Sequence, residues 1–549
     1  MNPLQRYAFF VLACMVFSGI LLAQNRAQPT EAIEPLLGLA LTPAERDSLM
    51  GDLAQYQKMY EALHSLPLQN AVPMSLVFNP IPQGFVMEPR QVPHDWGLPK
   101  QVAMPARLEE LAFFPVYKLA VLVRARKVTS LQLTQLYLDR IRTFADTLQC
   151  VITVLEATAL AQARAADEEI KQGKYRGLLH GIPYGIKDLM AVEGTRTTWG
   201  AAPYQDQVIA GTATVVKKLE AAGAVLLCKF TLGALAMGDI WYGGVTKNPW
   251  NLKQGSSGSS AGSASGTVAG LVAFSIGTET LGSIVSPSTR CGASGIRPTF
   301  GRVSRHGAMA LSWSMDKIGP ICRSALDAAI VLAVIQGKDE FDPFSIAAPY
   351  NFSARTDLKK LKIGYFKALF EATYPGKAND AKALEVIRSL GVELVAVDVP
   401  MDVPVVPLRL MLTAEAAASF DELTRSNRDD ALTDQRKQAW PNIFRAARFI
   451  PAVEYINASR HRYQLIQLYH TKLKDYDVIL SPSFGGTQLL TTNLTGHPCV
   501  VIPNGFDDKG APTSISFLGK LFGEGAPALL AHAYQQATEW EDLVPPAVK

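Results

Sequence analysis

The chain has few cysteines for its length. Only six of its 549 residues are cysteine, and they form neither a CxxC pair nor the ligand spacing of a zinc site. Most of them lie in apolar runs, where cysteine behaves as a small hydrophobic side chain. A disulfide framework and a metal site are therefore disfavoured, although a single disulfide in an oxidising compartment stays open.

The chain also lacks an excess of charge of either sign. Its 53 Lys and Arg residues and 49 Asp and Glu residues give a net charge of +4, and no dense run of basic residues occurs. Proteins that bind nucleic acid usually carry a clustered basic patch. The sequence therefore predicts no nucleic-acid partner.

Only one stretch raises the question of a membrane. Arg6 precedes an apolar run from Tyr7 to Ala23, and polar residues follow it. A basic residue, an apolar run and a small residue in this order are typical of a secretory signal peptide. The run is shorter than the roughly 20 residues that a spanning helix needs. We expect residues 1–23 to be removed, which leaves a soluble periplasmic or secreted protein; an uncleaved anchor is the alternative.

Residues 24–106 predict a helix and a proline-rich strap. Thr42-Pro43-Ala44-Glu45 has the residue types of a helix N-terminus. Apolar residues then recur every three or four positions as far as Leu63, so one helix face is expected to pack on the main domain. From Pro67 to Pro105 the prolines recur every few residues, which indicates extended chain.

Residues 107–549 alternate short apolar strands with helical segments. Strand-like runs occur at 151–154, 181–188 and 224–228, and an alanine-rich helix is expected at 157–172. Alternation of this kind predicts an α/β domain whose sheet is covered by helices on both faces.

The most unusual stretch runs from Asn248 to Thr299. It places many serines among glycines and then continues into the apolar run Leu271 to Ile276. A flexible linker is the alternative interpretation, but a linker has no need of interleaved apolar residues. Small residues threaded through an apolar segment indicate a closely packed backbone. Hydroxyl groups held on such a backbone are candidate nucleophiles.

Lys187 is a second unusual feature, because it ends a run that contains Ile182, Tyr184 and Ile186. The ordinary interpretation is a surface lysine whose stem crosses apolar surface. Burial would instead lower the pKa of the amine until the neutral form could accept a proton. A neutral amine near serines would act as a general base without histidine.

These two features together resemble the amidase signature family, serine hydrolases that cleave carboxamides with a Ser–Ser–Lys triad. The family pattern GGSSGGS followed by GTDTGGSI is similar to residues 257–263 and 277–284, without a gap between them. The resemblance extends from Arg107 to the end through further blocks at 180–188, 295–302, 316–320 and 495–503. It implies the amidase signature fold: a large mixed, twisted sheet covered by helices on both faces, with an N-terminal helical extension.

The resemblance also implies a role for each motif residue. Ser283 would be the nucleophile, Ser259 a bridging serine on a cis peptide bond, and Lys187 the base. An oxyanion hole would be formed by backbone N–H groups, those of Thr280, Leu281, Gly282 and Ser283. No metal or organic cofactor enters this scheme. The expected activity is hydrolysis of a small-molecule or peptide amide by an exported amidase, through an acyl-enzyme on Ser283.

Three positions depart from the family pattern. Leu281 replaces a glycine, Val285 an arginine and Glu279 an aspartate. A leucine in left-handed backbone would be strained, so we expect a negative φ at Leu281. Any anchoring role of the missing arginine is in doubt.

Several alternatives stay open at this point. Residues 258–262 fit G-x-S-x-G, the nucleophile elbow of an esterase, with Ser260 as nucleophile and His497 or His532 as its base. A non-catalytic ligand-binding homologue is another. A third is a glutamine-dependent amidotransferase subunit of tRNA charging, which a signal peptide argues against.

The substrate is the least predictable feature. Met237, Trp241 and Leu281 are candidates for an apolar substrate site, with ordinary core packing as the alternative. The variable segments 339–373 and 408–457 are candidates for specificity loops. Neither the identity of the amide nor the oligomeric state follows from the sequence.

Overall fold

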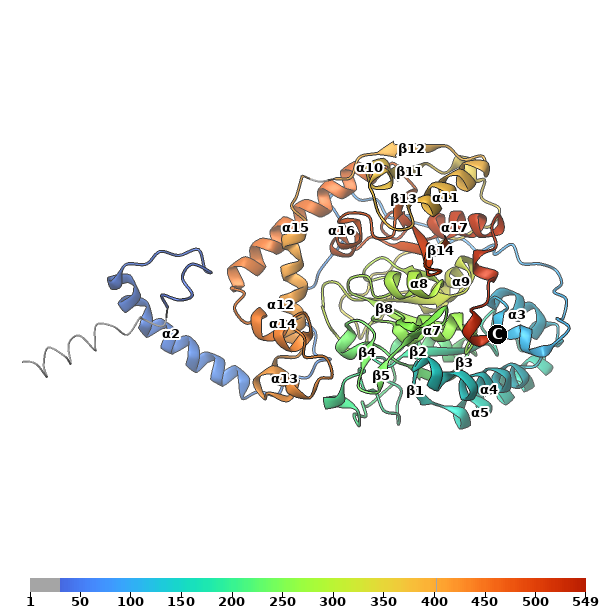
Figure 1. The fold of residues 1–549 in the computed structure, drawn as a ribbon, viewed down its shortest axis with the longest axis horizontal. Coiled ribbons are helices and arrows are strands. Elements are labelled where there is room, and N and C mark those ends of the chain that lie inside the picture. The colour runs from blue at the N-terminus through green and yellow to red at the C-terminus, as the bar shows by residue number, and fades with distance from the viewer. Residues whose placement is uncertain (1–29, 401) are drawn as a thin grey trace, which may run out of the picture. The chain divides into compact units, whose positions relative to one another are not determined.

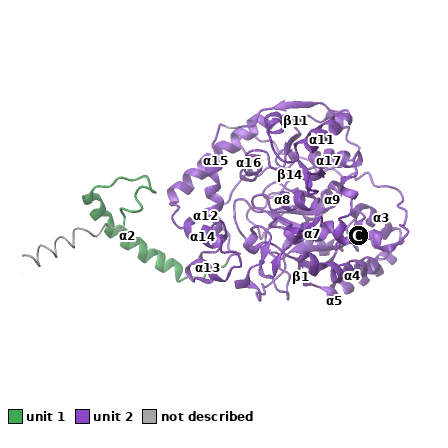
Figure 2. Cartoon of the chain, viewed as in Figure 1, with its two compact units in different colours: residues 1–69 green, residues 70–549 purple. Residues whose placement is uncertain are grey.

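The computed structural model describes residues 30–400 and 402–549. They belong to two compact units, which meet in the sequence between Gln69 and Asn70 (Figure 2). The expected signal peptide, residues 1–23, lies outside the described residues. Within those residues, none of the helices combines the length and apolar character needed to cross a bilayer.

The first unit contains the predicted N-terminal helix, α2 (Pro43–His64). The Thr42 side chain accepts a hydrogen bond from the backbone N–H of Glu45, and the Glu45 carboxylate accepts one from the Thr42 N–H at 2.7 Å. This reciprocal capping box fixes the start of the helix where the sequence placed it. That one face of α2 packs on the main domain stays a prediction.

In the described part of the second unit, eleven strands form one mixed sheet (Figure 1). In spatial order they are β1 (Val151–Val154), β3 (Val225–Phe230), β2 (Pro183–Lys187), β8 (Phe274–Glu279), β10 (Lys317–Cys322), β9 (Ser294–Arg297), β14 (Cys499–Phe506), β15 (Pro512–Gly519), β13 (Val478–Pro482), β11 (Ile363–Phe366) and β12 (Leu394–Val397). The large mixed sheet confirms the predicted fold class.

Helices surround this sheet. They are α3 (Val116–Arg124), α4 (Ser130–Leu148), α5 (Glu156–Lys171), α6 (Thr214–Ala221), α7 (Ala261–Val268), α8 (Val285–Cys291), α9 (Ala325–Ile335), α10 (Lys367–Glu371), α11 (Lys377–Ser389), α12 (Leu410–Ser419), α13 (Asp421–Arg425), α14 (Trp440–Ala447), α15 (Ala452–Leu473), α16 (Gln488–Thr495) and α17 (Gly525–Gln536). Helix α12 packs on α14 and on α15, and these three helices, orange in Figure 1, include part of the variable segment 408–457.

Four short strands form two small hairpins before Ser256: β4 (Ile240–Trp241) with β5 (Gly244–Val245), and β6 (Lys247–Asn248) with β7 (Asn251–Gly255). The strands that matter most for the site are β2, β3 and β8. β2 runs parallel to both of its neighbours, and every residue of β2 and β3 is buried. Parallel strands covered on both faces read as continuous apolar runs, as these do.

Residues 70–106, which belong to the proline-rich strap, form the start of the second unit. They are extended chain with few regular elements. The Phe78 ring meets Phe300 edge-on at 4.9 Å, and the Arg462 guanidinium lies 3.5 Å from the centre of the Phe78 ring. Further along, Trp96 stacks on Phe352 at 5.0 Å. Aromatic contacts thus fix the strap at separate points along its length.

Candidate active site

Lys187 lies at the carboxyl end of β2. The parallel pairing of Ile186 with Ile276 places this end beside the carboxyl end of β8. The Lys187 side chain is fully buried. Its Nζ atom lies 2.8 Å from Ser259 Oγ and 2.8 Å from Thr278 Oγ1. The surface-lysine interpretation is therefore wrong, and the amine contacts one of the two predicted catalytic serines.

Burial also sets the protonation of this amine. Desolvation lowers the pKa of Lys187 to about 7, although the charges of Asp316 and Glu279 act in the opposite direction. A pKa of about 7 leaves a large fraction of the amine neutral at neutral pH. The neutral form can accept a proton from the adjacent Ser259 hydroxyl.

Ser259 lies in the tight loop between β7 and α7. The Gly258–Ser259 peptide bond is cis, as the resemblance implied. A side chain at position 258 would meet the carbonyl oxygen of Gly238 at 1.8 Å, so only glycine fits there. Ser257, with φ of 60°, donates its N–H to the Asp239 carboxylate at 2.8 Å. These constraints hold the buried Ser259 next to Lys187.

Ser283 lies in the loop that joins β8 to α8. Gly282 has φ of 83°, whereas Leu281 does not lie in the positive-φ region, which confirms that expectation. Within the described chain, the backbone N–H groups of residues 280–283 donate no hydrogen bond to protein atoms. They are therefore available as donors beside the Ser283 hydroxyl.

Glu279 anchors this loop. Its carboxylate accepts hydrogen bonds from the N–H groups of Ile284 and Val285 at 2.9 and 3.0 Å, and it pairs with Arg297 at 2.9 Å. Burial would raise the pKa of Glu279, but the charge of Arg297 and these hydrogen bonds lower it to about 2. The ionised carboxylate thus ties the residue before the loop to the start of α8.

The comparison with known proteins agrees with this geometry. The Amidase family model matches residues 132–526. The chain belongs to the amidase signature family. It is therefore an amidase that hydrolyses C–N bonds, and the resemblance seen in the sequence is confirmed.

Two relatives and one solved structure illustrate the range of this family. The chain is 33% identical over 477 residues to a glutamyl-tRNA(Gln) amidotransferase subunit of Dehalococcoides mccartyi, covering 77% of this chain and 97% of that one. It is also 33% identical to a Mycobacterium bovis protein that carries the name amidase AmiD, covering 81% and 98%. Native peptide amidase from Stenotrophomonas maltophilia has a similar fold, with a TM-score of 0.68, 29% identity, and coverage of 77% and 97%.

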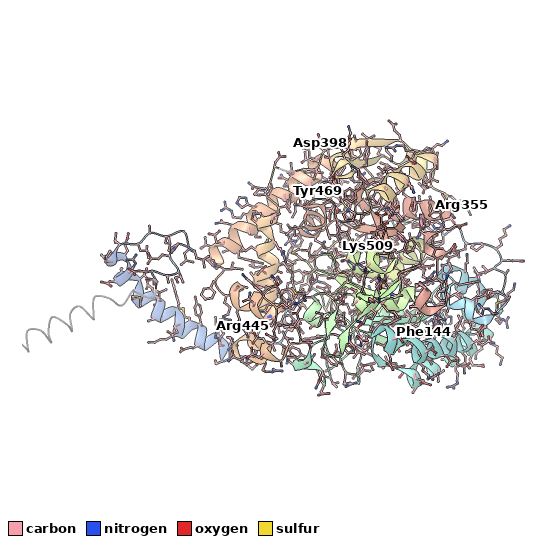
Figure 3. The ribbon with its side chains drawn as sticks, in the orientation of Figure 1. Phe144, Arg355, Asp398, Arg445, Tyr469 and Lys509 are labelled. Atoms are coloured by element: carbon pink, nitrogen blue, oxygen red, sulfur yellow. The ribbon has the colours of Figure 1, made fainter. Side chains whose placement is uncertain are left out.

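The missing family arginine is replaced by an apolar contact in this amidase. Val285 is fully buried in a cluster with Phe366, Leu473 and Tyr469, the last of which is labelled in Figure 3. A charge at position 285 would be costly in that cluster. The loop that carries Ser283 is anchored by the contacts of Glu279.

Ser260, the candidate nucleophile of an esterase, has a different role. Its buried hydroxyl donates to the Thr278 carbonyl at 3.0 Å and accepts from the Thr278 N–H at 3.1 Å, and its own N–H donates to the Ser283 carbonyl. Burial lowers the pKa values of His497 and His532 to about 3 and 4. The Ser260 hydroxyl therefore joins the loop before α7 to strand β8, its N–H joins that loop to Ser283, and the elbow interpretation is not supported.

The candidate substrate-binding residues lie in different surroundings. Met237 lines a cavity of about 290 Å³ together with Trp440, whose Nε1 donates to the Leu235 carbonyl at 2.9 Å. The Trp241 ring meets Tyr242 edge-on at 4.9 Å. Leu281 is partly buried against the core.

Two polar residues near the triad were missed from the sequence. Thr278 is the second hydroxyl partner of Lys187. Asp316 accepts a hydrogen bond from the Thr280 hydroxyl at 2.6 Å and lies in the block 316–320 that resembles the family. Both residues lie inside motifs that resemble the family, and those motifs could have drawn attention to them.

Within the described chain, no group of three His, Cys, Asp or Glu residues is arranged as a metal site.

Proposed function

We propose that this protein is an exported amidase that hydrolyses linear carboxamides to a carboxylic acid and ammonia or an amine. The observation that carries this proposal is the contact between Lys187 Nζ and Ser259 Oγ at 2.8 Å, made by an amine whose pKa is about 7. A base with a pKa near the working pH is suited to proton transfer.

The first half of the reaction forms an acyl-enzyme. Neutral Lys187 takes a proton from Ser259, Ser259 takes the proton of Ser283, and Ser283 Oγ attacks the amide carbonyl carbon. The N–H groups of residues 280–283 stabilise the oxyanion that forms, and each such donor contributes roughly 3 kcal/mol. Proton transfer in the reverse direction protonates the leaving nitrogen, and the C–N bond breaks.

The second half releases the acid. A water molecule gives a proton to the same relay and attacks the acyl carbon, and the C–O bond to Ser283 breaks as the serine is reprotonated. Lysine, bridging serine and nucleophile return to their starting protonation states. In this scheme the side chains of Lys187, Ser259 and Ser283 carry out every proton transfer.

The experiment is an amide panel with matched serine variants. Purified protein is offered aliphatic, aryl, anilide and C-terminal peptide amides, with glutamine as a separate arm, and release of ammonia or amine is measured. Ser283→Ala should abolish hydrolysis, whereas Ser263→Ala, which removes a hydroxyl that bonds the Ile276 carbonyl, should retain it. Mass spectrometry should find a trapped acyl or phosphonyl adduct on Ser283. An adduct on another residue, or no hydrolysis of any amide, would contradict the proposal, whereas hydrolysis of glutamine alone would restrict the substrate to that one amide.

Export is tested separately. The apolar run from Tyr7 to Ala23 supports it. The protein is expressed in a bacterial host, the cell is fractionated, and the N-terminus is sequenced. A mature chain in the periplasm or medium that begins just after Ala23 is expected. Full-length protein in the membrane fraction would indicate an uncleaved anchor, and full-length protein in the cytoplasm would contradict export.

A further inference from the structure

We propose that strap residues 70–73 form one wall of the substrate cavity, and that this cavity takes an apolar, uncharged group next to the scissile amide. The proposal rests on the proposed amidase function and narrows its substrate class. It gives the strap, which lies outside the matched segment 132–526, a part in specificity.

The cavity lies beside the triad. It has a volume of about 230 Å³, and Thr278 and Thr280 contribute to its lining. Thr278 is hydrogen-bonded to Lys187, and Thr280 begins the loop that carries Ser283. A group that fills this space therefore lies beside a hydrogen-bond partner of Lys187 and beside the start of the loop that carries Ser283.

The strap closes one side of this cavity. Asn70, Ala71 and Pro73 are among its lining residues. The Asn70 side chain donates to the Ala310 carbonyl at 2.8 Å and accepts from the Ala310 N–H at 2.8 Å. It also donates to the Ser419 carbonyl, at the end of α12, at 3.3 Å. One amide thus fixes the strap to the cavity wall at Ala310 and to the end of α12.

The interior of the cavity is apolar. Most of the side chains that line its depth are buried hydrophobic ones: Leu189, Met309, Leu311, Ile318 and Phe344. Contact with such walls favours an aryl or alkyl group, because its transfer from water is favourable and needs no hydrogen-bond partner.

The lining also contains charged groups, namely Lys217, Arg305, Asp316, Lys317 and Asp342. Lys317 donates to the Met315 carbonyl. Arg305 donates to the Trp313 carbonyl at 2.8 Å and lies 3.6 Å from the Asp342 carboxylate. Asp316 accepts hydrogen bonds from Thr280 and from the N–H groups of Leu311 and Ser312. Because Arg305, Asp316 and Lys317 are held by protein atoms, a charged substrate group would have to compete with these contacts, and burying it unpaired is costly.

The test compares two strap residues that make the same kind of contact. Gln91 also holds the backbone of one residue, donating to the Tyr350 carbonyl at 2.6 Å and accepting from its N–H at 2.8 Å, but it does not line the cavity. Asn70→Ala, Ala71→Trp and Gln91→Ala are made in the full chain. The readout is the ratio of kcat/KM for an aryl or long alkyl amide to kcat/KM for acetamide.

Asn70→Ala should lower this ratio about tenfold because the wall is no longer held, and Ala71→Trp should lower it further by filling the space. Gln91→Ala should leave the ratio unchanged, and thermal melting confirms that each variant folds. Equal changes in Asn70→Ala and Gln91→Ala, or an unchanged ratio in Ala71→Trp, would overturn the inference. If the wild type hydrolyses acetamide but not the apolar amides, the cavity inference fails while the amidase function stands. If it hydrolyses none of them, the proposed function itself fails.

Discussion

Two buried lysines lie near the carboxyl ends of neighbouring parallel strands, Lys187 on β2 and Lys229 on β3. Both side chains are fully removed from solvent. Lys229 pairs with the Asp188 carboxylate at 2.8 Å and also donates to the Thr197 hydroxyl at 2.6 Å. Among the described residues, Lys187 hydrogen-bonds only with the hydroxyls of Ser259 and Thr278. The same residue type at the same depth therefore has a charged partner in one place and neutral partners in the other.

This difference separates a structural lysine from a base. Burial lowers the pKa of both amines, but the adjacent Asp188 carboxylate opposes the shift at Lys229. Lys229 and Asp188 form a buried ion pair that joins β3 to the residue after β2. Burial alone does not distinguish the two lysines, but the neutral partners of Lys187 suit the role of base proposed for it.

The largest expected effect is the loss of activity in Lys187→Ala. Without the base, kcat for amide hydrolysis should fall about a thousandfold or more. The free energy of unfolding should change less than in Lys229→Ala, because no contacting carboxylate is left unpaired. Steady-state kinetics and a denaturant titration measure both quantities. A near-normal kcat would show that another group accepts the proton.

Lys229→Ala should lower the stability of the protein more than its activity, the reverse of Lys187→Ala. It leaves the buried Asp188 carboxylate without its cation, and breaking a buried pair in this way costs about 3–5 kcal/mol of stability. Chemical denaturation gives the value, and Asp188→Asn in the same background should restore part of it. Activity per folded molecule should fall far less than in Lys187→Ala. Wild-type stability in Lys229→Ala would refute the importance of the ion pair.

The pH dependence of activity should follow the deprotonation of the Lys187 amine. Because its pKa is about 7 in the folded protein, kcat/KM should rise with pH through about 7 as the amine loses its proton. Between pH 7 and the ordinary value of 10.5 the unfolded chain holds more protons at this site, so its contribution makes the free energy of unfolding rise with pH. Lys187→Ala should lack both rises. A rate that does not change between pH 6 and 8 would contradict the assignment.

The sequence could suggest a triad because the three residues stand in motifs with fixed spacing, and the structure shows the contact between Lys187 and Ser259. Lys187, Ser259 and Ser283 could be assigned residue by residue, together with the cis bond before Ser259. The role of Lys229 could not be predicted, because it stands in the apolar run Leu226 to Phe230 much as Lys187 stands in its own. What separates the two lysines is a partner across the sheet, and that depends on strand register.

The contacts of the strap could not be predicted from the sequence either, because they join residues that are far apart in the chain. Its prolines predicted extended chain, and residues 70–106 are largely without regular elements. The place of Asn70 in the cavity wall depends on Ala310 and Ser419, which lie hundreds of positions away in the sequence. No local sequence pattern predicts such a contact.

The smallest expected effect tests the neutral partner of Lys187. Thr278→Val removes a hydroxyl that lies 2.8 Å from the amine, so the amine is held less firmly and its charged form loses a hydrogen bond. The rate should fall about tenfold, and the midpoint of the pH profile should move to lower pH, whereas Thr278→Ser should keep both near wild type. Thr278→Asp imitates the Asp188–Lys229 pair and should move the midpoint to higher pH. A midpoint that moves in the same direction in the valine and aspartate variants would mean that the partner of Lys187 does not set its protonation.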